Sequence, residues 1–205
     1  MRNSDSLGMK KKQEDADAFQ ILLKSARHEI EKNGVLGLRV VDVAAGAHCS
    51  ITQIYRYFGS RNGLIAHALG DLYQEILDRG LESARELLGD AGPLTVDKVM
   101  RVFVPPRELS FYPFMAVRLQ ILAVSSTVPE LEERLSDISR AQFLKWKAML
   151  ENVRQRLPEQ TLMDDRAVTI DLLMMMPYYA RLLGEEGIAD DVYVDWVRKK
   201  LFPQS

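Results

Sequence analysis

The sequence predicts an all-α protein, and three observations support this fold class. Apolar residues recur at helical spacing along most of the 205 residues, which predicts about nine helices. Segments rich in glycine and proline fall between these periodic stretches, and no alternating run of β-branched residues is long enough to require a strand. A hydrophobic content of 47% is sufficient for a sizeable core in one or two domains.

The first predicted helix covers residues 14–32, where apolar side chains follow helical spacing from Phe19 to Ile30. Gly34 lies just past its end, a common place for a glycine that terminates a helix. We expect residues 1–13 to form a flexible arm before it.

Two short helices are predicted at residues 40–46 and 50–56, separated by a tight turn. Ser50 is placed to cap the second helix, because a serine hydroxyl accepts from the free backbone N–H groups of the first turn. His48 lies in the turn, and histidine adopts positive φ more readily than most residues. The first of the two helices has Leu38 and Arg39 before it, so its start lacks a side-chain acceptor.

The remaining helices are predicted from apolar stripes at helical spacing, from capping side chains, and from the glycines and prolines that end helices. Ser60 is expected to cap a long helix, and Thr127 with Glu130 has the capping-box spacing that opens a helix running toward Leu157. Pro177 is expected to kink a helix at residues 163–183. Further helices are expected at residues 94–103, 107–124 and 190–201.

The composition argues against several classes of protein. Cys49 is the single cysteine, which excludes an internal disulfide and a cysteine-based zinc site and suits a reducing compartment. The first 15 residues lack the apolar core of a signal peptide, and the longest apolar run, residues 172–180, is too short to span a bilayer. The three histidines and Cys49 lack metal-ligand spacing, and no catalytic or nucleotide-binding motif is present. We therefore expect a cytoplasmic protein that is not an enzyme and has no cofactor, no metal site and no membrane association.

Residues 42–64 read DVAAGAHCSITQIYRYFGSRNGL, and this pattern resembles the helix-turn-helix signature of the tetracycline-repressor (TetR) family of transcriptional regulators. The resemblance implies a DNA-binding domain at residues 14–74 and a helical domain for ligand binding and dimerisation at residues 75–205. It further implies a homodimer that represses transcription from a pseudo-palindromic operator in double-stranded DNA and is released by a small-molecule inducer.

The expected DNA contacts lie in and beside the second short helix. The net charge is −2, but residues 1–74 carry 10 Lys or Arg against 8 Asp or Glu, and this basic excess would suit phosphate contacts, including contacts from the lysines at 10–12. The resemblance implies that Tyr55 and Arg61 bind phosphates. In the major groove, Gln53 could pair with adenine and Thr52 could contact a thymine methyl group. The full predicted set is Arg39, His48, Ser50, Ile51, Thr52, Gln53, Tyr55, Arg56, Tyr57 and Arg61.

The C-terminal part is rich in methionine and aromatic residues, which line adaptable apolar cavities. Arg118 interrupts an apolar run and either pairs with an acid or contacts a polar group of the ligand. The predicted ligand-binding set is Phe103, Phe114, Met115, Arg118, Trp146, Met175 and Tyr178. The predicted dimer interface consists of apolar stripes on the last two helices, which could instead be core: Leu172, Met176, Tyr179, Leu183, Tyr193, Val197 and Leu201.

Two other functions remain open from the sequence. The chain could be an architectural DNA-binding protein without an effector. It could also be a helical enzyme or carrier that retains a vestigial helix-turn-helix, although its sequence shows no catalytic motif.

Overall fold

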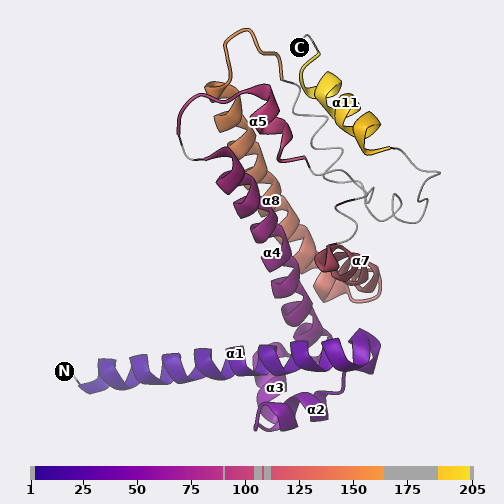
Figure 1. The fold of residues 1–205 in the computed structure, drawn as a ribbon. Coiled ribbons are helices and arrows are strands. Elements are labelled where there is room, and N and C mark those ends of the chain that lie inside the picture. The colour runs from indigo at the N-terminus through magenta and orange to yellow at the C-terminus, as the bar shows by residue number, and fades with distance from the viewer. Residues whose placement is uncertain (1–2, 90, 104–107, 109–111, 164–188, 204–205) are drawn as a thin grey trace. The chain divides into compact units, whose positions relative to one another are not determined.

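A computed structural model describes residues 3–89, 91–103, 108, 112–163 and 189–203, and it confirms the all-α prediction. Within these residues there are eight helices and no strand. The helix expected at residues 163–183 lies almost entirely outside the described residues. The helices, labelled as in Figure 1, are α1 (Asn3–Gly37), α2 (Val40–Gly46), α3 (Ile51–Phe58), α4 (Arg61–Leu88), α5 (Val96–Met100), α7 (Pro113–Ser125), α8 (Pro129–Arg156) and α11 (Asp190–Leu201).

The chain divides into two compact units. The first consists of Met1–Gln74 and Ile121–Ile138, and the second of Glu75–Gln120 and Ser139–Ser205. The expected domain boundary falls between residues 74 and 75, where the first segment of the first unit also ends. Residues 121–138 group with the first unit, although they lie within the C-terminal domain predicted at residues 75–205.

Helix α1 is longer at both ends than the sequence pattern predicted. It begins at Asn3, so residues 3–13, which were expected to be a flexible arm, are helical. Gly34 has a φ of 71°, as expected for a helix terminus, but helical structure resumes after this kink and continues to Gly37. The apolar face of α1 buries Leu22 and Leu23. Helices α2 and α3 contribute Val43 and Ile54 to the core of the same unit.

The junction between α3 and α4 depends on Ser60 and two glycines. Gly59 ends α3 with a φ of 73°, and the Ser60 hydroxyl accepts from the N–H of Gly63 at 2.8 Å, which confirms the predicted cap. A Cβ atom at Gly63 would clash with the carbonyl oxygen of Phe58. Glycine at position 63 therefore allows the first turn of α4 to lie directly against the last turn of α3.

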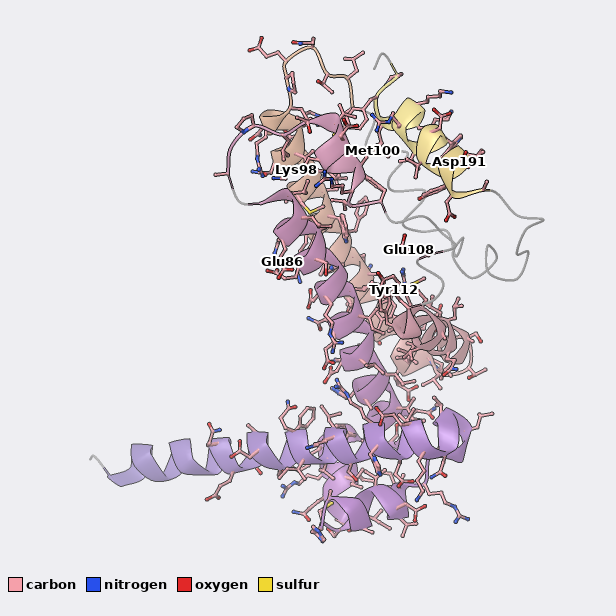
Figure 2. All side chains as sticks on the ribbon, viewed as in Figure 1. Glu86, Lys98, Met100, Glu108, Tyr112 and Asp191 are labelled. Carbon is pink, nitrogen blue, oxygen red and sulfur yellow. The ribbon has the colours of Figure 1, made fainter. Side chains whose placement is uncertain are left out.

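In the second unit, the C-terminal halves of α4 and α8 run side by side in the same direction (Figure 1). Lys145 on α8 donates to Asp78 on α4 at 2.7 Å, and Gln142 donates to the carbonyl of Leu77 at 2.8 Å. Met100 of α5, labelled in Figure 2, belongs to the core cluster beside these helices. The buried members of this cluster are Leu81, Ala84, Leu88, Leu94, Val99, Met100, Met149, Leu150, Val153, Leu157, Val197, Leu201 and Phe202.

Several helix ends differ from their predicted positions. Helix α8 starts at Pro129, so Val128 and not Thr127 precedes it, and the Thr127 hydroxyl donates to the carbonyl of Val124 at the end of α7 instead of forming the predicted capping box. Proline is a favoured residue in a first turn because it has no N–H to satisfy. Helix α5 is shorter than residues 94–103, and Thr95 caps it by accepting from the N–H of Lys98. Helix α11 spans the predicted residues 190–201. No helix in the described part of the chain is long and apolar enough to cross a membrane.

Candidate nucleic-acid interface

The turn between α2 and α3 has the predicted backbone conformation at His48. This residue has a φ of 51°, and its N–H donates to the carbonyl of Ala45 at 3.2 Å. The next residue, Cys49, donates to the carbonyl of Ala44 at 3.0 Å. Helix α2 begins after Arg39 without a side-chain cap, as predicted. The turn is thus held by its own backbone, and it fixes the direction in which α3 leaves α2.

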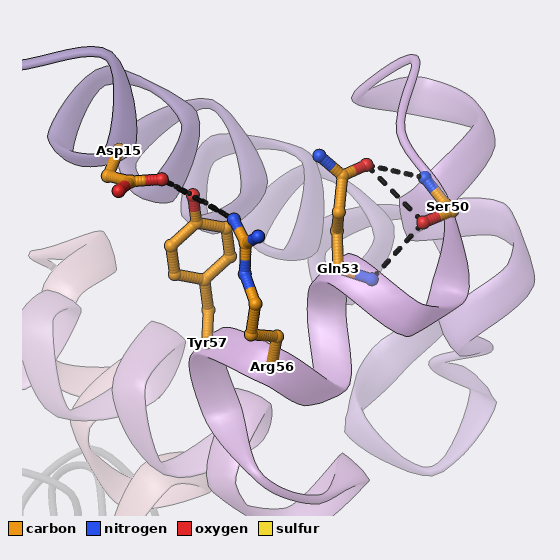
Figure 3. Close-up of polar contacts among 5 residues, drawn as sticks. All are labelled: Asp15, Ser50, Gln53, Arg56 and Tyr57. Atoms are coloured by element: carbon orange, nitrogen blue, oxygen red, sulfur yellow. Dashed lines mark hydrogen bonds and ion pairs between the residues drawn. The ribbon is translucent and has the colours of Figure 1, made fainter. Parts of the chain in front are cut away.

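Helix α3 begins with a reciprocal capping box (Figure 3). The Ser50 hydroxyl accepts from the N–H of Gln53 at 3.2 Å, which confirms that Ser50 caps this helix. In return, the Gln53 side-chain oxygen accepts from the N–H of Ser50 at 3.0 Å and from its hydroxyl at 3.3 Å. The side-chain nitrogen of Gln53 is turned away from Ser50 in Figure 3. The serine cap was predicted from the sequence, whereas the reciprocal bond from Gln53 was not.

The two sides of α3 differ in exposure. Ile54 and Phe58 are buried in the core of the first unit. Ile51 and Tyr55, one turn apart on the side that adjoins this buried face, are 39% and 44% exposed, and Thr52 beside them is also exposed. This exposed side combines apolar groups with hydroxyls, which suits contacts with base edges and with the DNA backbone.

The last turn of α3 is tied to α1 through Asp15 (Figure 3). The Tyr57 hydroxyl donates to the Asp15 carboxylate at 2.7 Å, and the Arg56 guanidinium approaches the same oxygen at 3.4 Å. Arg56 also donates to the Tyr57 hydroxyl at 2.9 Å. A DNA phosphate that binds Arg56 would therefore compete with a carboxylate of the same unit.

Arg61 contacts the last turn of α1 and the connection to α2. Its Nε and Nη2 atoms both donate to the carbonyl of Leu38 at 3.1 Å, and Nη2 also donates to the carbonyl of Val35 at 3.1 Å. A third carbonyl, that of Leu36, lies 3.4 Å from Nη2. Arg61 thus supplies hydrogen-bond donors to these backbone carbonyls, a role that differs from the phosphate contact expected from the sequence.

An aromatic cluster joins α1, α3 and α4 within the first unit. Phe19 stacks on Phe58 with ring centroids 4.8 Å apart, and His67 packs edge-on against both rings at 5.5 and 5.4 Å. Burial among these rings lowers the pKa of His67. The nearby Arg134 cation lowers this pKa further, while the Asp71 carboxylate opposes the shift.

The predicted ligand-binding residues occupy several different environments. Phe103 and Trp146 are partly buried against the core cluster of the second unit. Met115 is buried, Arg118 is partly buried and Phe114 is 38% exposed. Met175 and Tyr178 lie outside the described residues. A pocket of about 270 Å³ lies between α4 and α8, and it is lined by other residues: Arg85, Leu88, Gly89, Ala148, Met149, Asn152 and Arg156.

The predicted dimer interface requires a correction on α11. Val197 and Leu201 are 1% and 0% exposed and belong to the core cluster of their own chain, so they have no surface to offer a second copy. The exposed apolar side chains of α11 are Val192 and Trp196. Tyr193 packs partly against the core. The other predicted interface residues lie outside the described part of the chain: Leu172, Met176, Tyr179 and Leu183.

An all-α chain in which a tight turn joins two short helices, with the second helix capped and exposed along one side, is a helix-turn-helix protein. Residues 22–68 match the family model described as bacterial regulatory proteins, tetR family. The match covers the segment that carries α2, α3 and the start of α4, and it agrees with the resemblance seen in the sequence.

Solved structures of similar fold support the assignment of the whole chain to this architecture. A protein from Mesorhizobium loti assigned to the TetR family of transcriptional regulators is 15% identical, with a TM-score of 0.62 over 91% of this chain and 94% of that one. GusR from Salmonella enterica is 17% identical, with a TM-score of 0.60 over 90% and 95% of the two chains. A protein from Streptomyces coelicolor assigned as a transcriptional regulator is 14% identical, with a TM-score of 0.59 over 90% and 98%. At these identities the likeness concerns the fold. No curated protein sequence matches the chain significantly.

Proposed function

We propose that this protein is a transcriptional repressor that binds a pseudo-palindromic operator as a homodimer and leaves it when a small-molecule inducer binds. The observation that carries the proposal is the exposed side of α3, where Ile51, Thr52 and Tyr55 follow a firmly capped helix start. A helix of this kind enters the major groove with its N-terminal residues against the base edges. The match of residues 22–68 to the tetR family model supports the same role.

The proposed contacts separate residues that read bases from residues that bind the DNA backbone. Gln53 and Thr52 lie in the first turn of α3 and would read bases. Tyr55 would place its hydroxyl on a phosphate while its ring packs on the helix surface. Arg39 is exposed before α2 and Arg56 is exposed on α3, so both would supply positive charge to phosphates.

A homodimer follows from the limited reach of one reading helix. One helix reads only a few base pairs, and two-fold symmetry places two such helices about 34 to 36 Å apart, one turn of DNA. Trp196 is 41% exposed on α11 and is proposed to contribute to the dimer surface. Trp196→Glu should then yield monomers by light scattering, whereas Leu87→Glu, at a similarly exposed apolar position on α4, should not. A Trp196→Glu protein that remains dimeric would contradict this part of the proposal.

Release by an inducer requires the ligand to favour an arrangement that does not bind DNA. A typical coupling of about 1 to 3 kcal/mol lowers operator affinity by roughly 5- to 150-fold. By reciprocity, operator DNA should weaken ligand binding by the same factor. The ligand is proposed to bind among the helices of the second unit, near Phe103 and Trp146.

The direct test is a gel shift of the purified protein on the intergenic DNA upstream of its own gene, with and without fractions of a metabolite extract. Retention that a fraction abolishes is the expected result. Retention that no fraction changes would indicate an architectural DNA-binding protein. Absence of retention on this fragment and on a randomised duplex library would favour a helical enzyme or carrier.

A further inference from the structure

The capping box at the start of α3 determines which atoms Gln53 can present to DNA. A side-chain amide carries one acceptor oxygen with two lone pairs and one nitrogen with two donor hydrogens. The Gln53 oxygen accepts from both the N–H and the hydroxyl of Ser50, at 3.0 and 3.3 Å, so both of its lone pairs are occupied. The amide nitrogen is turned away from Ser50 (Figure 3). In this conformation Gln53 offers donors to a ligand and no acceptor.

The box is expected to persist when DNA binds, because its two halves support each other. Ser50 accepts from the N–H of Gln53 at 3.2 Å while Gln53 satisfies the N–H of Ser50. Turning the amide around would place its nitrogen against the Ser50 N–H, leaving two donors facing each other. It would also leave a donor at the start of the helix without its partner.

The base edges of the major groove present different hydrogen-bond donors and acceptors to such a side chain. Adenine presents the N7 acceptor beside the N6 amino donor, so bidentate pairing with glutamine needs both the amide oxygen and the amide nitrogen. Guanine presents two adjacent acceptors, N7 and O6. A side chain that carries donors alone matches the guanine edge and meets the adenine amino group with a second donor.

We propose that Gln53 reads guanine through its amide nitrogen, with its oxygen held by Ser50, and does not make the adenine pair expected from the sequence. This inference rests on the proposed function, since it assumes that α3 enters the major groove. It adds a specificity rule, namely that the residue at position 53 both completes the capping box of α3 and determines which base is preferred.

Two variants separate the capping role of Gln53 from its reading role. Gln53→Glu keeps an acceptor for the Ser50 N–H and hydroxyl, and glutamate is a usual partner in a capping box, so α3 should remain capped. It removes the donor hydrogens, and its second oxygen can accept from the cytosine amino group. Gln53→Met has a similar length but lacks both the acceptor for the box and the donors for the base.

The experiment selects sequences from a randomised duplex library with the full-length wild-type protein and both variants, and then measures affinities for the selected duplexes. The pair read by Gln53 is the one where Gln53→Met loses its preference. At that pair the wild type should prefer guanine by about 5- to 150-fold, and 7-deazaguanine, which lacks N7, should weaken binding. Gln53→Glu should shift the preference to cytosine on the same strand while its melting temperature stays close to that of the wild type. The new carboxylate repels every duplex to the same extent, so this effect cancels when the affinities for two duplexes are compared as a ratio.

Three results would overturn the inference, and they differ from failure of the proposed function. Selection of the same sequence by Gln53→Met and the wild type would show that Gln53 reads no base. A preference for adenine that disappears when a purine without the 6-amino group replaces it would show that the amide oxygen faces the DNA. An unchanged guanine preference in Gln53→Glu would show that the donors are not needed. Failure of the wild-type protein to enrich any sequence would instead remove the proposed function, and the inference with it.

Discussion

In each unit one arginine donates to backbone carbonyls at the end of a long helix and beyond it, although only the arginine of the first unit lies in the predicted DNA-binding motif. In the first unit Arg61 donates to the carbonyl of Val35 in the last turn of α1 and to that of Leu38 before α2. In the second, Arg156 at the end of α8 donates to the carbonyls of Leu88, Gly89, Ala91 and Gly92 at 2.7 to 3.1 Å, between α4 and α5. The two arginines therefore have the same structural role. An arginine in a DNA-binding motif can donate to backbone carbonyls of its own chain.

The cores beside these arginines differ in chemistry. The cluster of the second unit consists of apolar side chains with Phe202 among its most buried members. In the first unit a titratable ring, His67, packs against Phe19 and Phe58. The stability of the first unit should therefore depend on pH in a way that this core cluster of the second does not.

The largest effect is expected when the arginine of the second unit is removed. Arg156→Ala leaves four carbonyls without their donor, two of them partly buried, and should lower the free energy of unfolding by about 2 to 4 kcal/mol. Arg154→Ala is the matched control on the same helix. Arg154 pairs with Glu151 on the surface, so this change should cost about 0.5 kcal/mol or less. Denaturant unfolding measures both. Equal losses would show that the contacts of Arg156 contribute no more than a surface pair.

Arg61→Ala tests whether the two arginines are equivalent. We expect a loss of about 1 to 3 kcal/mol in unfolding free energy, since fewer carbonyls lose their partner than in Arg156→Ala. DNA affinity should also fall because the path into α2 is loosened, but the slope of log affinity against log salt should stay unchanged. A slope reduced by about one per half-site would instead assign Arg61 a phosphate contact, and would break the equivalence.

The pH dependence tests the difference between the cores. The folded state lowers the pKa of His67 below its ordinary value, so the unfolded chain binds more protons as the pH falls below about 6.5, and stability falls with it. The melting temperature should therefore decrease between about pH 7 and pH 5.5, and His67→Gln should reduce this dependence. A His67→Gln protein with the same pH profile as the wild type would remove His67 as its cause.

The smallest effect is expected at Asp15. Its ion pair with Arg56 is exposed on both sides, so Asp15→Asn should change the unfolding free energy by no more than about 1 kcal/mol. Loss of the carboxylate frees Arg56 for phosphate, so affinity for DNA of any sequence should rise and the salt slope should steepen. Asp17→Asn, one half-turn away on the same helix, is the control for the general change in charge. Equal effects of the two changes would show that the contact with Arg56 is unimportant.

The sequence predicted local features well because they depend on a few neighbouring residues. The Ser50 cap, the positive φ at His48 and the uncapped start of α2 all follow from side-chain chemistry within a single turn. The Ser60 cap was predicted for the same reason.

Long-range partners could not be predicted in this way. Arg61 contacts carbonyls more than 20 residues away, and Arg156 contacts carbonyls more than 60 residues away, separations that no local pattern encodes. The stripe through Val197 and Leu201 showed that α11 has an apolar side, but periodicity does not distinguish a core of the same chain from a partner. Thr127 and Glu130 have the spacing of a capping box, yet the Thr127 hydroxyl donates to a carbonyl of the preceding helix.

The glycine at position 63 has a consequence for the mutational tolerance of the gene. Any side chain there would meet the Phe58 carbonyl, which is backbone and cannot rotate away. An exposed position such as Thr52 has room for other side chains, and a change there would alter the proposed contacts with bases. In a library covering every single amino-acid change, we expect codon 63 to be depleted of all alternatives, including alanine, because the clash is with backbone.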